Sequence, residues 1–122
     1  MDHKIGVIPF DISGDNIAIM FVTSQRRGRW ILPKGNLKPD ESHKKGCKRE
    51  AFEEAGVVGK VLPVCLGIYS RTHNLQANRL PSIVAVFPLK CSGYLTDFPE
   101  AGQRRRKWVT RKKAARLVEN PE

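Results

Sequence analysis

Residues 35–57 read GNLKPDESHKKGCKREAFEEAGV. This stretch predicts a helix over residues 42–55, because Gly56 follows as a helix stop and Asp40 or Ser42 can cap the first turn.

One face of the predicted helix carries only small side chains. At about 100° per residue, these side chains form a single stripe along the helix. Their size lets the helix lie close against a sheet. The residues of the stripe are Cys47, Ala51 and Ala55.

Three carboxylates lie beside that stripe, within an arc of about 100°. Glu50 and Glu54 are four residues apart, and Glu53 flanks them. Like charges at this spacing repel, and the helix dipole disfavours negative charge in the last turn. Arg49 can pair with Glu53 but does not neutralise three carboxylates. A hard divalent cation such as Mg²⁺ or Mn²⁺ would neutralise them, and a solvated acidic helix end is the alternative reading.

The stretch resembles the signature of the Nudix hydrolase family, G-x5-E-x7-R-E-U-x-E-E-x-G-U, in which U is a bulky aliphatic residue. All seven fixed letters are present, and Ala51 at the first U position is the one departure. The resemblance implies a single domain over residues 1–122. Its fold would be an α/β/α sandwich with a central mixed β-sheet, in which the signature forms a loop-helix-loop that carries a metal site.

The resemblance also implies an activity, the metal-dependent hydrolysis of a diphosphate linkage with Mg²⁺ or Mn²⁺ as cofactor. A metal bound to phosphate oxygens stabilises developing charge and lowers the pKa of bound water. The implied roles are metal binding for Glu50, Glu54 and the Gly35 carbonyl, and a supporting ion pair between the catalytic-site residues Arg49 and Glu41. Glu53 would be either a further metal ligand or the general base, and we expect it to be the base.

Within the family, the chain is most similar to the diphosphoinositol polyphosphate phosphohydrolase branch, whose members also cleave diadenosine polyphosphates. That branch often has a run of glycines after the proline, whereas this chain has Lys34-Gly35-Asn36, a less flexible loop. The segments that carry the likeness are residues 22–27, 30–35, 67–69 and 104–109.

Basic residues dominate the composition. Lys and Arg number 22 against 12 Asp and Glu, which gives a formal charge of +10 and a pI near 10.0. Such a charge attracts polyanions, although a solubilising surface gives the same count. Several arginines from separate loops could converge on clustered phosphates. The candidate substrate-binding residues are Arg26, Arg27, Arg29, Lys34, His73, Arg104 and Arg105.

The rest of the chain predicts a sheet and a second helix. The segment 17–22 is apolar at every position, which indicates a strand buried on both faces. Pro88 is expected near a strand end or at a sheet edge. We expect strands over 4–10, 17–24, 30–32, 57–69, 83–89 and 106–109, turn-rich or loop segments over 11–16, 33–35, 70–81 and 92–103, and a helix capped by Thr110 and running to residue 118.

Other features exclude several classes of protein. The three cysteines form no C-x-x-C pair, which argues against a disulfide framework or zinc ribbon and favours a reducing, cytoplasmic location. The longest apolar run, 17–22, is far shorter than a membrane span, so no membrane partner is expected. The N-terminus does not read as a secretory signal.

Three functions remain open from the sequence. The first is hydrolysis of a small polyphosphorylated substrate, such as a diadenosine polyphosphate, a diphosphoinositol polyphosphate or another nucleoside diphosphate derivative. The second is the same chemistry on RNA 5′ ends, against which the sequence shows no basic platform interleaved with aromatic residues. The third is an inactive Nudix module that binds polyanions. The oligomeric state is not predicted.

Overall fold

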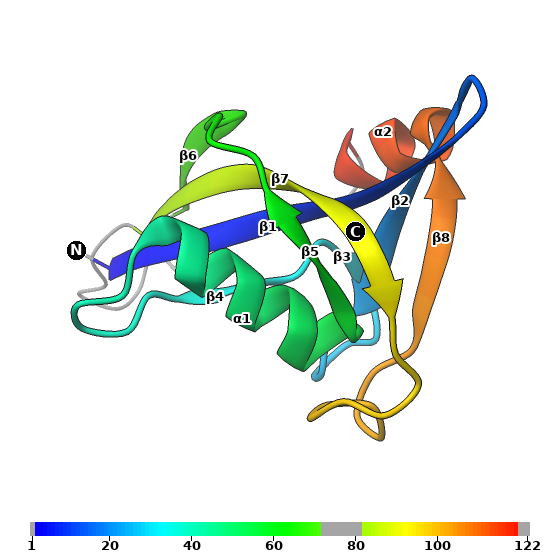
Figure 1. Cartoon of the computed structure of the whole chain (residues 1–122). Coiled ribbons are helices and arrows are strands. Elements are labelled where there is room, and N and C mark those ends of the chain that lie inside the picture. The colour runs from blue at the N-terminus through cyan, green and yellow to red at the C-terminus, as the bar shows by residue number, and fades with distance from the viewer. Residues whose placement is uncertain (1, 72–81, 120–122) are drawn as a thin grey trace.

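The computed structural model describes residues 2–71 and 82–119. One mixed sheet separates two helices, with α1 packed across one face and α2 on the other, beside β2 and β8 (Figure 1). The elements are β1 (Asp2–Ser13), β2 (Asn16–Thr23), β3 (Trp30–Ile31), β4 (Lys34–Asn36), α1 (His43–Ala55), β5 (Val57–Val61), β6 (Gly67–Arg71), β7 (Ser82–Tyr94), β8 (Arg106–Thr110) and α2 (Arg111–Glu119).

The sheet has the strand order β3-β2-β1-β7-β5, with β4 paired to β1, β6 to β7 and β8 to β2. The pairing of β1 with β7 is parallel, and the other strand pairs are antiparallel. The sheet is therefore mixed and has a helix on each face. The predicted α/β/α sandwich is confirmed.

The first two strands form a longer hairpin than the sequence suggested. Residues 11–16 were expected to be a connector, but Asp11 pairs with Ala18 and Ile12 with Ile17. Only Gly14 and Asp15 form the turn, with Gly14 at φ 61°. A glycine in the left-handed region allows this tight turn, so the ladder continues to the hairpin end.

The segment after Pro33 is a strand rather than a stop. β4 pairs with β1, with Ile5 opposite Gly35 and Gly6 opposite Lys34. Its three residues are held by a partner about 30 positions earlier, which no local pattern reveals. This pairing fixes the start of the signature loop to the middle of the sheet.

The predicted strand over 57–69 is two strands, β5 and β6, which both pair with β7. β7 itself is longer than the predicted 83–89 and extends into the segment expected as a loop after residue 92. Pro88 lies inside β7, opposite Ile8 of β1, and not at an end or edge. Its carbonyl oxygen still accepts a hydrogen bond from the Leu62 amide at 3.0 Å, so the sheet loses a single donor there.

The two helices begin and end close to where the sequence predicts. The Ser42 hydroxyl accepts the Lys45 amide hydrogen at the start of α1, and Gly56 closes the helix at φ 66°. The Thr110 hydroxyl accepts the Lys113 amide hydrogen at 3.2 Å, as expected for the cap of α2. Neither helix in the described residues is long and apolar enough to cross a bilayer.

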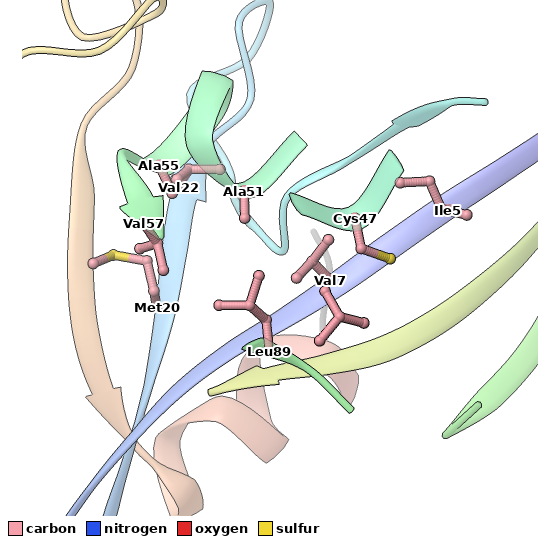
Figure 2. Close-up of a cluster of buried hydrophobic side chains, with 10 residues drawn as sticks. Ile5, Val7, Met20, Val22, Cys47, Ala51, Ala55, Val57 and Leu89 are labelled. Carbon is pink, nitrogen blue, oxygen red and sulfur yellow. The ribbon is translucent and has the colours of Figure 1, made fainter. Parts of the chain in front are cut away.

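The main core lies between α1 and the sheet (Figure 2). Cys47, Ala51 and Ala55 are fully buried, so the small-residue stripe packs against the sheet as predicted. Met20 lies in this core, whereas the neighbouring Phe21 packs under α2, which confirms burial of β2 on both faces in its second half. The three cysteines are free thiols.

Candidate active site

β4 carries Gly35 directly against the first glutamate of the helical cluster. A Cβ atom placed on Gly35 would lie 2.5 Å from the Cδ and Oε2 atoms of Glu50. Real Cβ atoms do not approach other atoms so closely, so only glycine fits here. The glycine of the signature is thus the residue that lets the loop backbone touch the carboxylate.

Glu41 and Arg49 form a two-point ion pair. The Arg49 Nε donates to Glu41 Oε2 at 2.7 Å and Nη2 donates to Glu41 Oε1 at 2.8 Å. Arg49 Nη2 also donates to the Asn36 carbonyl at 3.0 Å, and the Lys38 amide donates to Glu41 at 3.0 Å. This fork ties the loop of residues 36–41 to the helix, and the predicted contact between Arg49 and Glu41 is present. Their mutual hydrogen bonds lower the pKa of Glu41 to about 2 and raise the pKa of Arg49.

The three helical glutamates differ in burial. Glu50 and Glu54 are 7% and 5% exposed, whereas the side chain of Glu53 is 34% exposed. Arg49 Nη1 donates to Glu50 and, at 3.2 Å, to Glu53. Glu54 accepts the Lys34 amide hydrogen at 3.2 Å. Burial, followed by a hydrogen bond with Glu50, raises the pKa of Glu54 to about 9.

This donor set fits a hard divalent cation. Glu50 and Glu54 are buried and in mutual contact, and carboxylate oxygens of this kind suit Mg²⁺ and Mn²⁺. Among the described residues, no three acidic, histidine or cysteine side chains already converge on one point. Arg49 lies between Glu50 and Glu53, so a third carboxylate would reach a cation only after Glu53 turned away from that arginine.

Arg104 joins the carboxylates from the far end of the chain. Its Nη2 lies 3.8 Å from Glu54 Oε2, its Nε donates to Glu100 at 2.7 Å, and its Nη1 donates to the Thr23 carbonyl at 2.9 Å. The Arg104 side chain is only 10% exposed. The sequence placed Arg104 near substrate, and the structure places it against the predicted metal-site glutamates.

Glu100 is a site residue that the sequence reasoning missed. Its amide donates to the Glu53 carbonyl at 3.0 Å, so the segment before β8 packs on the end of α1. Its side chain also accepts from Gln25 at 3.3 Å. These contacts join segments about 50 and 75 residues apart, and no local spacing signals them.

The other predicted substrate-binding residues are spread over the surface around this end of the sheet. Arg26 and Arg27 are exposed in the turn from Ser24 to Arg29. The Ser24 amide donates a hydrogen bond to the Arg29 carbonyl at 2.7 Å and closes this turn. The backbone amide of Lys34 donates a hydrogen bond to Glu54. Arg105 is exposed over the ring of Trp30. His73 lies outside the described residues.

Residues 3–122 match the NUDIX domain family. The chain belongs to the Nudix family. It is 32% identical over 123 residues to Nudix hydrolase 21, chloroplastic, of Arabidopsis thaliana, a match that covers 95% of this chain and 59% of that protein. It is 30% identical to diphosphoinositol polyphosphate phosphohydrolase 3-alpha of Mus musculus, over 83% of this chain and 60% of that protein. The chain thus spans less than two thirds of the length of these relatives.

Solved structures support the Nudix fold. The C. elegans Ap4A hydrolase superposes with a TM-score of 0.73 at 18% identity, covering 99% of this chain and 89% of that one. The NUDIX domain of Shewanella oneidensis NrtR, complexed with ADP ribose, gives a TM-score of 0.69 at 19% identity and covers 95% and 77%. At these identities the likeness concerns the fold.

Proposed function

We propose that this Nudix domain is a metal-dependent hydrolase that cleaves a diphosphate linkage in a small, phosphate-rich substrate. The observation that carries the proposal is the buried pair Glu50 and Glu54, of which Glu50 lies against Gly35. Arg49 reaches Glu50 and Arg104 reaches Glu54, yet burial and the contact with Glu50 still raise the pKa of Glu54, so the doubly charged pair is unfavourable until a divalent cation joins it. The names of the mouse diphosphoinositol polyphosphate phosphohydrolase and the worm Ap4A hydrolase support a diphosphoinositol polyphosphate or a diadenosine polyphosphate as substrate.

Mg²⁺ or Mn²⁺ would be held by Glu50, Glu54 and the Gly35 carbonyl. When bound, the ion supplies charge neutralisation at phosphate oxygens and a lowered pKa for water. The remaining roles fall to side chains of the chain itself. The cytoplasmic location stays a prediction, as does the absence of a membrane partner.

Glu53 is our candidate for the general base. It is the most exposed of the three glutamates, and its free carboxylate oxygen can accept a proton from an attacking water. The water oxygen forms a bond to phosphorus and the water proton goes to Glu53. The bond from that phosphorus to the bridging oxygen breaks, and the bridging oxygen leaves with the bonding electrons as part of the departing phosphate. Arg49, braced by Glu41, holds Glu53 and Glu50 in position, while Arg26 and Arg27 lie free to meet outer phosphates.

The test is a substrate panel with a titration of Mg²⁺ and Mn²⁺. The panel contains a diadenosine polyphosphate, a diphosphoinositol polyphosphate and ADP-ribose. Glu53→Gln should lower kcat by about 10²- to 10⁴-fold, with the free energy of unfolding nearly unchanged. Asp15→Asn, which removes one carboxylate from the exposed hairpin turn, is the matched control and should keep its activity. No turnover of any substrate with either metal would overturn the hydrolase, and full activity of Glu53→Gln would remove Glu53 as the base.

A second candidate function is the removal of pyrophosphate from RNA 5′ ends. The observation that favours it is the formal charge of +10, far more than the carboxylate site uses. A 5′-triphosphorylated oligonucleotide is therefore included in the same panel. Turnover of this oligonucleotide faster than of the small molecules would establish the second function in place of the first.

A further inference from the structure

Three cations gather on the face of the sheet opposite α1. We name Arg105, Lys107 and Lys113 the cation cluster. Lys107 Nζ lies 4.2 Å from the centre of the Trp30 ring, and the Arg105 guanidinium carbon lies 5.4 Å from it. Lys107 pairs in register with Phe21, which packs under α2, so the cluster is on the α2 side. β8 and β3 lie on either side of β2 (Figure 1).

The charge of the cation cluster is not neutralised within the described part of the chain. There, no acidic side chain forms an ion pair with any of its three members. Desolvation, then the hydrogen bond and charge of Lys113 and the charge of Arg105, lower the pKa of Lys107. The Trp30 ring offsets part of the repulsion through cation–π contacts. An anion bound at this point would offset the rest.

The cation cluster is separate from the carboxylate site. Arg104 and Arg105 are consecutive, yet Arg104 contacts Glu54 while Arg105 lies over Trp30. The cation cluster therefore spans β8 and α2, beside Trp30 of β3.

We propose that the cation cluster binds the phosphate backbone of a single-stranded nucleic acid. Arg105 and Lys107 are alternate residues, about 7 Å apart along an extended chain, a step comparable to that between successive phosphates of an extended strand. Once these cations turn to phosphates, the Trp30 ring beneath them is open to a stacked base. A basic platform with an aromatic residue, which the sequence did not reveal, is thus present, because the fold brings Trp30 beside residues 75 and 77 positions later in the chain.

This proposal goes beyond the hydrolase and does not rest on it, so it is tested without catalysis. The probe is a fluorescent 5′-hydroxyl oligouridine, which has no terminal phosphate to cleave. Fluorescence anisotropy is measured in EDTA over a range of salt concentrations. We expect binding that weakens with salt, as for other contacts to phosphate.

The key variant is the double substitution Lys107→Glu with Lys113→Glu. It should weaken binding at low salt at least ten-fold and reduce the slope of log affinity against log salt by about 1.4, since each phosphate contact to a single strand contributes about 0.7. Lys44→Glu with Lys45→Glu changes the net charge equally on the exposed start of α1 and should keep most of the affinity. Urea unfolding checks that each variant folds, and Lys113→Ala replaces the double variant if that variant does not.

Three results would overturn the proposal. Equal loss in both double variants would mean that net charge alone attracts the probe. Binding of inorganic tripolyphosphate without binding of the oligonucleotide would reduce the cluster to a small-anion site. Binding to phosphatidylserine vesicles but not to the oligonucleotide would assign the surface to a membrane.

Discussion

Gly35 matters for the candidate site because it has no side chain. A Cβ atom on Gly35 would collide with the Glu50 carboxyl group. The pairing of Gly35 with Ile5 of β1 fixes the Gly35 backbone at this place in the sheet. The loop cannot retreat without breaking the pairing of β4 with β1. A substitution at this position therefore moves the carboxylate rather than the loop.

Gly35→Ala should lower kcat on a diphosphate substrate at least ten-fold, because the methyl group displaces the Glu50 carboxyl. It should also lower the free energy of unfolding by about 1–3 kcal/mol, the usual effect of overpacking. Gly102→Ala is the control, since a Cβ there meets no atom within 4 Å. Equal activity in the two variants would show that the position of Glu50 is not set by Gly35.

Glu41 gives a pH dependence whose sign is fixed. The Arg49 hydrogen bonds lower its folded pKa from 4.5 to about 2, so the charged form stabilises the fold above the unfolded pKa. That stabilisation is lost as the pH falls from about 4.5 towards 2. Glu41→Gln cannot ionise and lacks this contribution at every pH.

The difference in free energy of unfolding between wild type and Glu41→Gln should therefore be largest near neutral pH and shrink as the pH approaches 2. Urea unfolding at several pH values measures it. Asp15→Asn, at the exposed hairpin turn, should show little difference at any of them. A difference for Glu41→Gln that stays constant from pH 6 to 2 would contradict the role of the ion pair with Arg49 in acid stability.

At the scale of elements, α1 is defined by features that lie within about 15 residues. Ser42 caps it, Gly56 ends it, and the stripe Cys47, Ala51 and Ala55 buries one face. Each of these is visible in the sequence, which is why the helix was predicted well. Gly56 also has a neighbour that the sequence does not show, since a Cβ on it would lie 2.5 Å from the Phe98 ring.

Gly14 and Gly56 share a left-handed backbone conformation but differ in how crowded their surroundings are, so comparing them distinguishes backbone strain from steric crowding. Gly14→Ala, at φ 61° with no atom within 4 Å, should lose about 1–2 kcal/mol from the left-handed backbone alone. Gly56→Ala, at φ 66°, should lose clearly more, because its Cβ also meets Phe98 and the Leu95 carbonyl. Urea unfolding of both variants measures the losses. Equal losses would mean that the segment after β7 yields freely at Gly56.

The sheet was predicted less well because its strands depend on distant partners. β4 consists of three residues that become a strand only through β1, and Pro88 lies inside β7 with its carbonyl hydrogen-bonded to the Leu62 amide, a long-range contact that the sequence does not reveal. The residues of the candidate site also fall into a local group and a long-range group. Gly35, Glu41, Arg49 and the glutamates lie in one short motif, whereas the contacts of Arg104 and Glu100 require the whole fold.

At the scale of the molecule, the two faces of the sheet carry different chemistry. The α1 side holds the carboxylates and the main core, while the α2 side holds the cation cluster and a smaller core around Phe21. The net charge of +10 is thus a sum over two faces, of which one carries the carboxylates and the other carries the cation cluster. Substitutions in the cation cluster should therefore leave the carboxylate site intact, and substitutions in the carboxylate site should leave the cation cluster intact.

The parallel pairing of β1 with β7 joins residues that are always 80 positions apart, from Asp2 with Ser82 to Phe10 with Lys90. During synthesis, the strand made first must therefore wait for a partner that leaves the ribosome much later. Contacts of such long range slow folding, because a long loop has to close before they form. Until then, the edge of β1 that pairs with β7 has no strand partner on the nascent chain, although β2 and β4 can already pair with its other edge.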